Sequence, residues 1–255
     1  MKIHKSAEID ASAVLGENVS VGPFSIIGPG VRIGDNTEIG SHVLLVSTEI
    51  GPDCRVFHGA CIGEEPQIAG FKNTASCVEI GQGTVIREFV TIHRGAKEGQ
   101  KTKIGKHCLL MNYVHIAHDC EVGDHVVIVN YTGLSGHVVV EDYAFVSGQV
   151  GVHQFVRIGK NAMVGGKAGV NQDILPFTMV EGTPARLVGT NSIGLRRKNF
   201  SPEVRSAIKK SLKYLLAPEM NTSQAVARMQ AEFEMVDEIR YLVNFIKNSS
   251  RGITK

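Results

Sequence analysis

Aliphatic residues recur at every sixth position along most of the chain. From Ile104 to Val170, each sixth residue is leucine, isoleucine or valine. A second run starts at Ile3 and reaches Leu45, where the frame slips once before it resumes at Ile50. A short fixed period is typical of solenoid proteins, in which each repeat forms one structural unit. The pattern therefore predicts a repeated unit of one short strand and one turn.

A compact residue stands two positions before each aliphatic residue, so both should point inward, because alternate residues of a strand share one face. Cys54, Cys108 and Cys120 occupy such positions, and we interpret them as core residues. Glycine often follows the aliphatic residue, as at Gly16 and Gly123, where we expect a turn with unusual backbone angles. Three units would close a coil of about 18 residues, and stacked coils would form a parallel β-helix.

Two polar segments that contain glycine, at 64–76 and 94–103, interrupt the repeat without losing its frame. We expect them to form loops that project from the corners of the β-helix. Loops on a rigid scaffold commonly hold ligands, and insertions tolerated at a surface would give the same pattern.

The stretch HIAHDC, at 115–120, places two histidines in a segment otherwise built from aliphatic and small residues. Because the repeat turns Ile116 and Cys120 inward, His115 and His118 should project away from the core. Neither is expected to be a buried structural histidine.

Polar residues from three successive coils should stack along the edge that carries His118, since neighbouring strands lie about 4.8 Å apart. Acyl transfer needs such a set: a general base, a glycine N–H as oxyanion donor, and groups that fix the substrate. A zinc site and a solvated edge without function are the alternatives. The stacked residues are His118, Gly136, His137, His153 and Gln154.

A helical pattern replaces the six-residue repeat after about residue 190. Ser201 and Pro202 are typical of a helix start, and apolar residues on one face follow them. Two further helices are expected to begin at Thr222 or Ser223 and near Asp237. Residues 196–214 hold seven lysine and arginine residues and one glutamate, which indicates either a solvated helix face or a docking surface for an acidic partner.

The overall composition shows no strong bias. The net charge is +2 and 20% of residues are charged, so nucleic acid is not an expected partner, and the basic segment lacks interleaved aromatic residues. Five cysteines without a C-x-x-C pair argue against both disulfides and a cysteine-based zinc site. No apolar run of about 18 residues and no leader sequence is visible, so we expect a cytoplasmic protein without a membrane span.

The repeats resemble those of the hexapeptide-repeat acyltransferases, and several fragments resemble the UDP-N-acetylglucosamine acyltransferases of lipid A biosynthesis. The resemblance implies a mainly β fold, with a left-handed parallel β-helix over 1–190 and a C-terminal α-helical domain over 191–255. The left hand comes from the resemblance, because parallel crossovers in general are right-handed. The matching fragments are TIHRG (91–95), LLMNYVHIAHDCEVG (109–123), SGHV (135–138), VHQF (152–155), MVGG (163–166) and GLRRKNFS (194–201).

The resemblance implies a role for each matching residue. His118 would be the general base, Asp119 would orient its imidazole, and the N–H of Gly136 would stabilise the oxyanion. Gly166 would limit the acyl chain length, and Arg197 would lie near the nucleotide diphosphate. No metal or cofactor is implied beyond the 4′-phosphopantetheine of acyl carrier protein, which carries the acyl donor. The substrate-binding residues implied are His115, His137, His153, Gln154, Gly166, Asn191, Arg197 and Lys198.

The resemblance thus implies transfer of an (R)-3-hydroxyacyl group from acyl carrier protein to the 3-hydroxyl of UDP-N-acetylglucosamine by a homotrimer, with sites between neighbouring subunits. Acyl carrier protein is acidic and would fit the basic segment. Members of the family commonly have an acidic residue directly after Pro-Gln and a lysine soon after it. Here Ile68 stands in place of the acidic residue. Lys72 would take the role of the lysine from a shifted position. A 3-amino UDP-sugar therefore remains open as acceptor.

Three other functions remain open. The related glucosamine N-acyltransferase usually carries a domain before the repeat, whereas here the repeat begins at Ile3. Trimeric β-helix carbonic anhydrases bind zinc through histidines but lack a substantial C-terminal helical extension. A catalytically silent assembly module is the third alternative.

Overall fold

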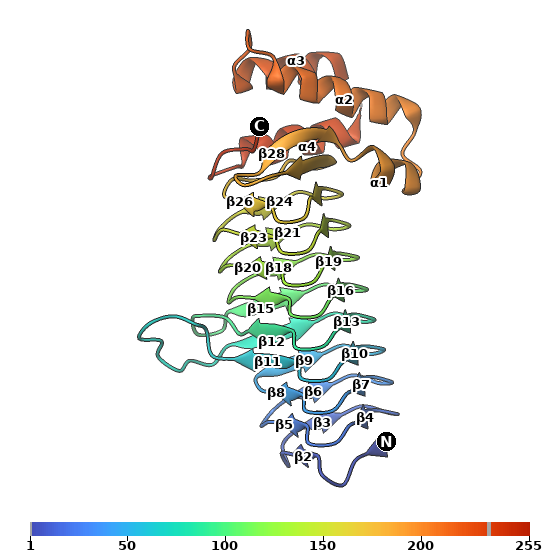
Figure 1. The fold of residues 1–255 in the computed structure, drawn as a ribbon, viewed down its shortest axis with the longest axis vertical. Helices are drawn as coiled ribbons and strands as arrows, with labels where there is room; N and C mark the ends of the chain where they lie inside the picture. The colour runs from blue at the N-terminus through green and yellow to red at the C-terminus, as the bar shows by residue number, and fades with distance from the viewer. Residues whose placement is uncertain (1, 234–235) are drawn as a thin grey trace.

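The computed structural model describes residues 2–233 and 236–255; residues 1, 234 and 235, which fall within the two predicted domains, lie outside the described residues. Short strands follow one another around three sheets, and successive coils stack into an elongated prism with helices at one end (Figure 1). Strands of neighbouring coils pair in parallel, 18 residues apart in the regular part, as in the pairing of His115 with Gly133. The predicted parallel β-helix is confirmed.

We name the three sheets after their first strands. The β1 sheet contains β1 (Lys2–Ile3), β4 (Ser20–Val21), β7 (Glu38–Ile39), β10 (Arg55–Val56), β13 (Val85–Ile86), β16 (Leu109–Leu110), β19 (Val127–Ile128), β22 (Phe145–Val146), β25 (Met163–Val164), β27 (Thr178–Glu181) and β28 (Arg186–Thr190). The β2 sheet contains β2 (Glu8–Ile9), β5 (Ile26–Ile27), β8 (Leu44–Leu45), β11 (Cys61–Glu64), β14 (Thr91–His93), β17 (His115–Ile116), β20 (Gly133–Leu134), β23 (Gly151–Val152) and β26 (Gly169–Val170). The β3 sheet contains β3 (Val14–Leu15), β6 (Arg32–Ile33), β9 (Thr48–Ile50), β12 (Cys77–Ile80), β15 (Lys101–Ile104), β18 (Glu121–Val122), β21 (Val139–Val140) and β24 (Arg157–Ile158).

The repeated aliphatic residues form the core, as predicted, from Val21 to Val170. Ile3 is 45% exposed because the first coil has no neighbour on its outer side. Cys54, Cys108 and Cys120 are buried among these residues, and burial raises the pKa of the Cys120 thiol to about 12. Such a thiol stays protonated at neutral pH, which fits a packing role.

The prediction for the glycines after the aliphatic residues was wrong. Gly16 and Gly123 do not have positive φ angles; the turns instead place residues such as Asn18 and Phe24 in the left-handed region. The glycines are needed because the coils approach closely. A Cβ atom at Gly16 would lie 2.7 Å from the backbone nitrogen of Asp35 in the next coil.

Two loops leave the prism at the middle of its length (Figure 1). The first covers 65–76, between β11 and β12. The second covers 94–100 and ends earlier than the predicted 94–103, because Lys101–Ile104 forms β15 and pairs with all of β12. Backbone and side-chain bonds join the loops: Gly99 N–H donates to Ala75 O at 2.7 Å, and Arg94 Nη2 donates to Asn73 Oδ1 at 2.6 Å.

In the described part of the chain, four helices follow the last coil: α1 (Ser192–Arg197), α2 (Pro202–Leu216), α3 (Thr222–Phe233) and α4 (Asp237–Lys247). The three predicted helix starts are confirmed, and the hydroxyl of Ser201 accepts a hydrogen bond from Val204 N–H at the start of α2. The sequence did not reveal α1 or the antiparallel pairing of β27 with β28. Leu175 and Phe177 pack in the helical core. Within residues 2–233 and 236–255, no helix is long and apolar enough to cross a membrane.

Candidate active site

A groove of about 870 Å³ runs along the outer face of the β2 sheet. His115, His118, Gly136 and His153 line it, and Gln67 reaches it from the loop at 65–76. The strands β17, β20 and β23 pair in register beneath the groove, so the turns that follow them lie one above another. The predicted stacking of these three turns is therefore present.

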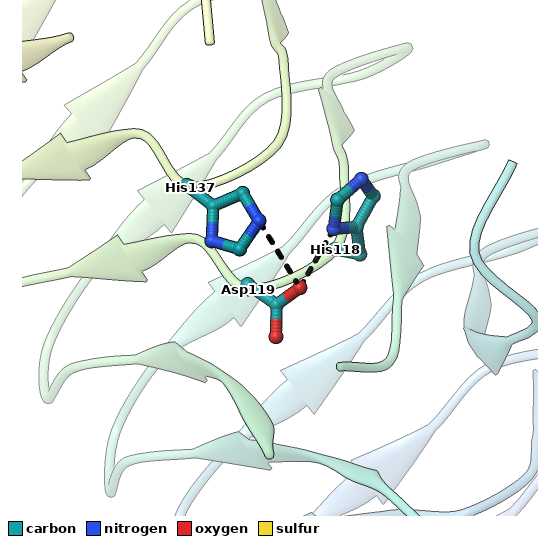
Figure 2. Close-up of side chains that lie close together, drawn as sticks. All are labelled: His118, Asp119 and His137. Atoms are coloured by element: carbon teal, nitrogen blue, oxygen red, sulfur yellow. Dashed lines mark hydrogen bonds and ion pairs between the residues drawn. The ribbon is translucent and has the colours of Figure 1, made fainter. Parts of the chain in front are cut away.

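His118 and Asp119 form a close pair (Figure 2). Nδ1 of His118 lies 2.7 Å from Oδ2 of Asp119. Because a carboxylate only accepts hydrogen bonds, Nδ1 carries the hydrogen, which leaves Nε2 of the neutral imidazole with a free lone pair. The side chain of Asp119 is only 7% exposed, so water competes little for this hydrogen bond. The geometry is that of a general base oriented by a carboxylate.

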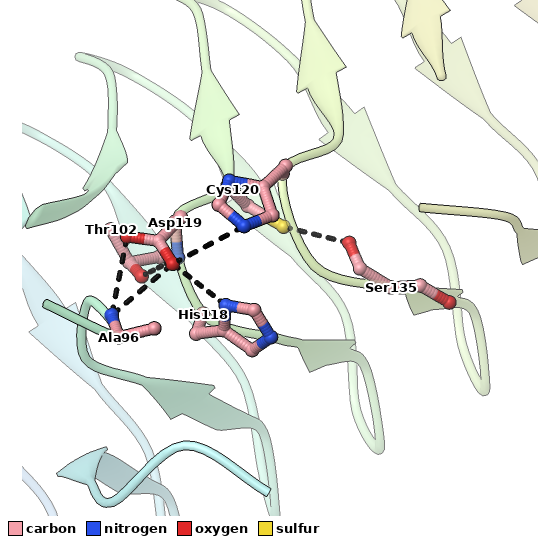
Figure 3. A network of polar contacts seen from close by, with 7 residues as sticks. Ala96, Thr102, His118, Asp119, Cys120 and Ser135 are labelled. Carbon is pink, nitrogen blue, oxygen red and sulfur yellow. Dashed lines mark hydrogen bonds and ion pairs between the residues drawn. The ribbon is translucent and has the colours of Figure 1, made fainter. Parts of the chain in front are cut away.

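Asp119 is itself held from two sides (Figure 3). The N–H of Ala96, in the loop at 94–100, lies 3.2 Å from Oδ1 and 3.1 Å from Oδ2 of Asp119. The N–H of Asp119 donates to Oγ1 of Thr102 at 2.8 Å, and Thr102 is fully buried. The second loop thus fixes the carboxylate that orients His118.

Gly136 lies directly against the imidazole of His118. A Cβ atom on residue 136 would come within 2.6 Å of Nε2 of His118, so only glycine fits beneath the ring in this position. The N–H of Gly136 has no hydrogen-bond partner among the described residues, while its carbonyl accepts from Phe155 N–H at 3.2 Å. An unpaired N–H next to a base can serve as an oxyanion donor.

His137 lies on the other side of Asp119. Its Nε2 is 3.7 Å from Oδ2 of Asp119, and its ring stacks on Phe155 with the centroids 4.7 Å apart. One ligand atom each from His118, Asp119 and His137 lie within 4.8 Å of one another, so the cluster could hold a metal ion.

His115 lies at the start of the groove, where its Nδ1 and the hydroxyl of Thr91 are 2.9 Å apart. Burial, and secondarily the nearby His93, lowers the pKa of the His115 imidazole. His115 is therefore uncharged around neutral pH.

The lowered pKa of His115 predicts a loss of stability in acid. Below about pH 6.5 the unfolded chain binds a proton at this histidine that the folded chain does not, so the free energy of unfolding falls as pH falls. The variant His115→Gln should show a smaller fall between pH 7.5 and 5.5 in urea unfolding at one fixed protein concentration. An equal fall in both proteins would contradict the assignment.

The other predicted substrate-binding residues lie outside the groove in the single chain. Gln154 is exposed on the edge next to His153. Gly166 lines a separate hollow of about 410 Å³ with Tyr131 and Gly148.

Three predicted residues lie at the start of the helical region. Asn191 caps α1, since its Oδ1 accepts from Gly194 N–H at 3.0 Å and its Nδ2 donates to the carbonyl of Asn161 at 2.9 Å. Arg197 is exposed, and Nζ of Lys198 lies 3.4 Å from the ring centroid of Tyr143. Their roles stay predictions.

The sequence did not point to Ala96 or Thr102. Ala96 acts through its backbone N–H, which no side-chain pattern can reveal. Thr102 stands in the series of compact inward residues, and its hydroxyl was the only available signal.

Comparison with known proteins matches both halves of this architecture. Residues 2–46 and 101–136 match bacterial transferase hexapeptide repeats, and residues 173–254 match UDP-N-acetylglucosamine O-acyltransferase, domain 2. The acyl-[acyl-carrier-protein]--UDP-N-acetylglucosamine O-acyltransferase of Thermodesulfovibrio yellowstonii is 43% identical over 256 residues, covering 100% of this chain and 99% of the relative. The chain belongs to the UDP-N-acetylglucosamine O-acyltransferase family. The predicted family is confirmed.

Solved structures of UDP-N-acetylglucosamine O-acyltransferases agree in fold. LpxA of Bacteroides fragilis superposes with a TM-score of 0.96 at 38% identity, covering 99% of both chains. LpxA of Acinetobacter baumannii superposes with a TM-score of 0.95, also at 38% identity and with 99% of both chains covered. The β-helix is left-handed, as the resemblance implied.

Proposed function

We propose that this protein transfers an (R)-3-hydroxyacyl group from acyl carrier protein to the 3-hydroxyl of UDP-N-acetylglucosamine, which is the first step of lipid A biosynthesis. The observation that carries the proposal is the His118–Asp119 pair, which opens onto a groove in a chain that matches acyltransferases over its whole length. The protein is an acyltransferase of this family.

His118 and Gly136 divide the chemistry between them. Nε2 of His118 takes the proton of the sugar 3-hydroxyl while the oxygen forms a bond to the thioester carbonyl carbon. The N–H of Gly136 donates to the oxyanion of the tetrahedral intermediate. When the intermediate collapses, the C–S bond breaks and the pantetheine thiolate takes the proton from the His118 imidazolium. Asp119 stabilises that imidazolium, and the scheme needs neither a metal ion nor a covalent enzyme intermediate.

Thr102 should matter for this chemistry beyond its effect on stability. In Thr102→Val the buried N–H of Asp119 loses its acceptor, so we expect unfolding to become easier by about 1–3 kcal/mol. A shift of the carboxylate should also lower kcat by about 10-fold while KM changes little. Both quantities follow from chemical denaturation and steady-state kinetics.

Thr84→Val is the matched control for this variant. The buried hydroxyl of Thr84 accepts from Cys108 N–H at 3.1 Å and donates to Gly105 O at 2.8 Å, and neither of these partners bonds Asp119. It should lose comparable stability and keep its kcat. Equal kcat in the two variants would show that Thr102 has only a structural role.

The active form is proposed to be a homotrimer with sites between subunits. Gly166, Arg197 and Lys198 lie outside the groove of their own chain, so a neighbouring subunit would be needed to bring such residues to it. An exposed row of stacked aromatic rings, including Phe89, Tyr113 and Tyr131, also lies unpartnered along one edge of the prism. Large exposed apolar surfaces of this kind are typical of interfaces.

Acyl carrier protein is proposed to dock on the basic segment at 196–214. The reaction is proposed to take place in the cytoplasm. On α2, Lys209 and Lys213 are exposed, whereas Lys210 pairs with Glu232 of α3. Exposed cations that have no ion-pair partner among residues 2–233 and 236–255 suit an acidic protein. In the loop at 65–76, Ile68 is 39% exposed next to Gln67, so this loop is proposed to contact the acceptor.

The proposed function is tested by product analysis. The purified protein is incubated with 3-hydroxyacyl carrier proteins and UDP-N-acetylglucosamine, with and without EDTA, and products are identified by mass spectrometry. An O-acylated nucleotide sugar formed equally in EDTA is expected. If only the 3-amino analogue reacts, the acceptor is the 3-amino UDP-sugar and not UDP-N-acetylglucosamine. Loss of activity in EDTA would favour a metal ion bound by His118, Asp119 and His137. Light scattering tests the trimer.

A further inference from the structure

Arg94 is a buried cation at the start of the second loop. Its side chain is only 10% exposed, and no other lysine or arginine among the described residues is buried. Its Nε, which is shielded from solvent, has no hydrogen-bond partner within residues 2–233 and 236–255. Burial of a charge costs free energy unless its donors are paired, so an apolar side chain would stabilise this position at least as well. The guanidinium therefore needs an explanation other than packing.

The guanidinium of Arg94 contacts the first loop near both of its ends. Nη2 donates to Oδ1 of Asn73 at 2.6 Å and lies 3.6 Å from Oε1 of Glu65. Its Cζ lies 5.8 Å from the ring centroid of Phe71. Nη1 donates to Oγ of Ser47, directly before β9, at 3.3 Å. The planar fork of one arginine thus joins the loop to the prism.

The middle of the first loop depends on this contact. Within the described part of the chain, the bond from Arg94 to Asn73 is the only hydrogen bond that joins residues 66–74 to residues outside that segment. The other bonds of the loop to its surroundings are at its two ends. Loss of the Arg94–Asn73 bond should therefore leave the ends of the loop in place and free its middle.

The middle of the first loop is also the part that reaches the groove. Gln67 lines the groove together with His115 and His118, and Ile68 beside it is 39% exposed. The position of Gln67 over the groove therefore depends on the contact that Arg94 makes further along the same loop.

The segment that carries Arg94 holds the catalytic pair as well. The N–H of Ala96, two residues after Arg94, lies 3.1 Å from Oδ2 of Asp119 (Figure 3). The N–H of Arg94 donates to the carbonyl of Glu64 at 3.1 Å, which fixes the start of the segment. One anchored segment thus sets the first loop and the carboxylate beside His118 relative to each other.

We propose that Arg94 is a positioning residue for the acceptor, because it holds the first loop in the arrangement that places Gln67 over the groove. This inference rests on the proposed function, in which the first loop contacts UDP-N-acetylglucosamine. Without the bond to Asn73 the loop samples other arrangements, and the apparent affinity falls with the fraction of molecules in the competent one. The reacting groups are unchanged once the acceptor is bound, so KM for the nucleotide sugar rises while kcat is kept.

Asn73→Ala tests this inference from the side of the loop. Asn73 is exposed, so its removal breaks the bond without opening a cavity in the core. KM for UDP-N-acetylglucosamine should rise at least about 10-fold, which is the typical contribution of a hydrogen bond to a charged group. In steady-state kinetics, kcat and the KM for the acyl carrier donor should stay within about 2-fold of the parent.

Gln82→Ala is the matched control. Gln82 is exposed in the turn after β12, and its amide donates to Oδ2 of Asp53 at 2.9 Å. The variant also deletes one exposed amide with its side-chain hydrogen bond. It should leave both KM values unchanged.

A double-mutant cycle assigns the effect to Arg94. In an Arg94→Met background, Asn73→Ala should add little to KM, because the bond is already lost. Hydrogen exchange without substrate gives a second readout: residues 65–76 should exchange faster in Asn73→Ala than in the parent, and residues 115–120 at the same rate.

The outcomes separate this inference from a purely structural role. An unchanged KM in Asn73→Ala, an equal rise in KM for both substrates, or unchanged exchange in the first loop would each overturn it. If the parent transfers no acyl group, the proposed function fails. Calorimetry with UDP-N-acetylglucosamine then decides, since the inference requires binding to the parent and weaker binding to Asn73→Ala.

Discussion

Replacement of His118 by alanine is expected to leave the protein folded and to lower kcat by at least about 100-fold. The imidazole lies outside the aliphatic core and is the group whose Nε2 faces the groove, while Nδ1 is bound to Asp119. General-base catalysis by one positioned side chain typically contributes about 10²–10⁴-fold. Steady-state kinetics with the acyl carrier donor, together with a thermal melt, measures both parts of the expectation.

His125→Ala is the matched control for this variant. His125 is an exposed histidine one turn along the same prism, where it stacks between His107 and Tyr143 on a different edge. Its removal deletes the same side chain and should leave kcat within about 2-fold of the parent. A comparable loss of kcat in both variants, or no loss in His118→Ala, would show that His118 is not the base.

Substitution of Gly136 by alanine is expected to lower kcat by about 100-fold while the coil remains intact. The added Cβ would come within 2.6 Å of the imidazole of His118, and the ring is the more mobile partner, so the ring must move. Displacement of a reacting group by about 1 Å can cost about 10²-fold in rate. Retained kcat would show that neither the ring position nor the backbone donor at residue 136 matters.

The effect of Gly136→Ala can be assigned to His118 by combining the two substitutions. If alanine at 136 acts only by moving the imidazole, it should have little further effect in a His118→Ala background. A further loss in the double variant would instead measure an independent contribution of the backbone donor. Melting curves of all three variants check that the coil persists.

The sequence predicted the scaffold well because the aliphatic period and the inward direction of side chains follow from strand geometry alone. It placed His118 above Gly136 correctly, since an 18-residue coil turns sequence distance into a known step in space. It failed for Gly16, where the constraint is the backbone of another coil. Contacts between coils depend on three-dimensional closeness that the pattern does not encode.

The remaining parts of the site could not be read from the pattern for a related reason. Ala96 binds Asp119 through a backbone N–H, and its position depends on how the two loops join. The sequence predicted that the second loop ends at residue 103, whereas it ends at residue 100. The reason is that Lys101–Ile104 pairs with Cys77–Ile80, a strand that lies before the loop in the sequence. The direction in which Lys198 points, toward Tyr143, depends on how the helices cover the last coil.

The stacking of coils also decides how the molecule opens. Each strand pairs only with the coils before and after it, so cooperative loss of structure can start at an end and stop part-way. The first coil is the weak end, since Ile3 is 45% exposed, whereas the helices cover the other end. Several complete coils separate the weak end from His118. Local unfolding of the N-terminal coils is therefore expected to leave the coils around His118 and Gly136 folded.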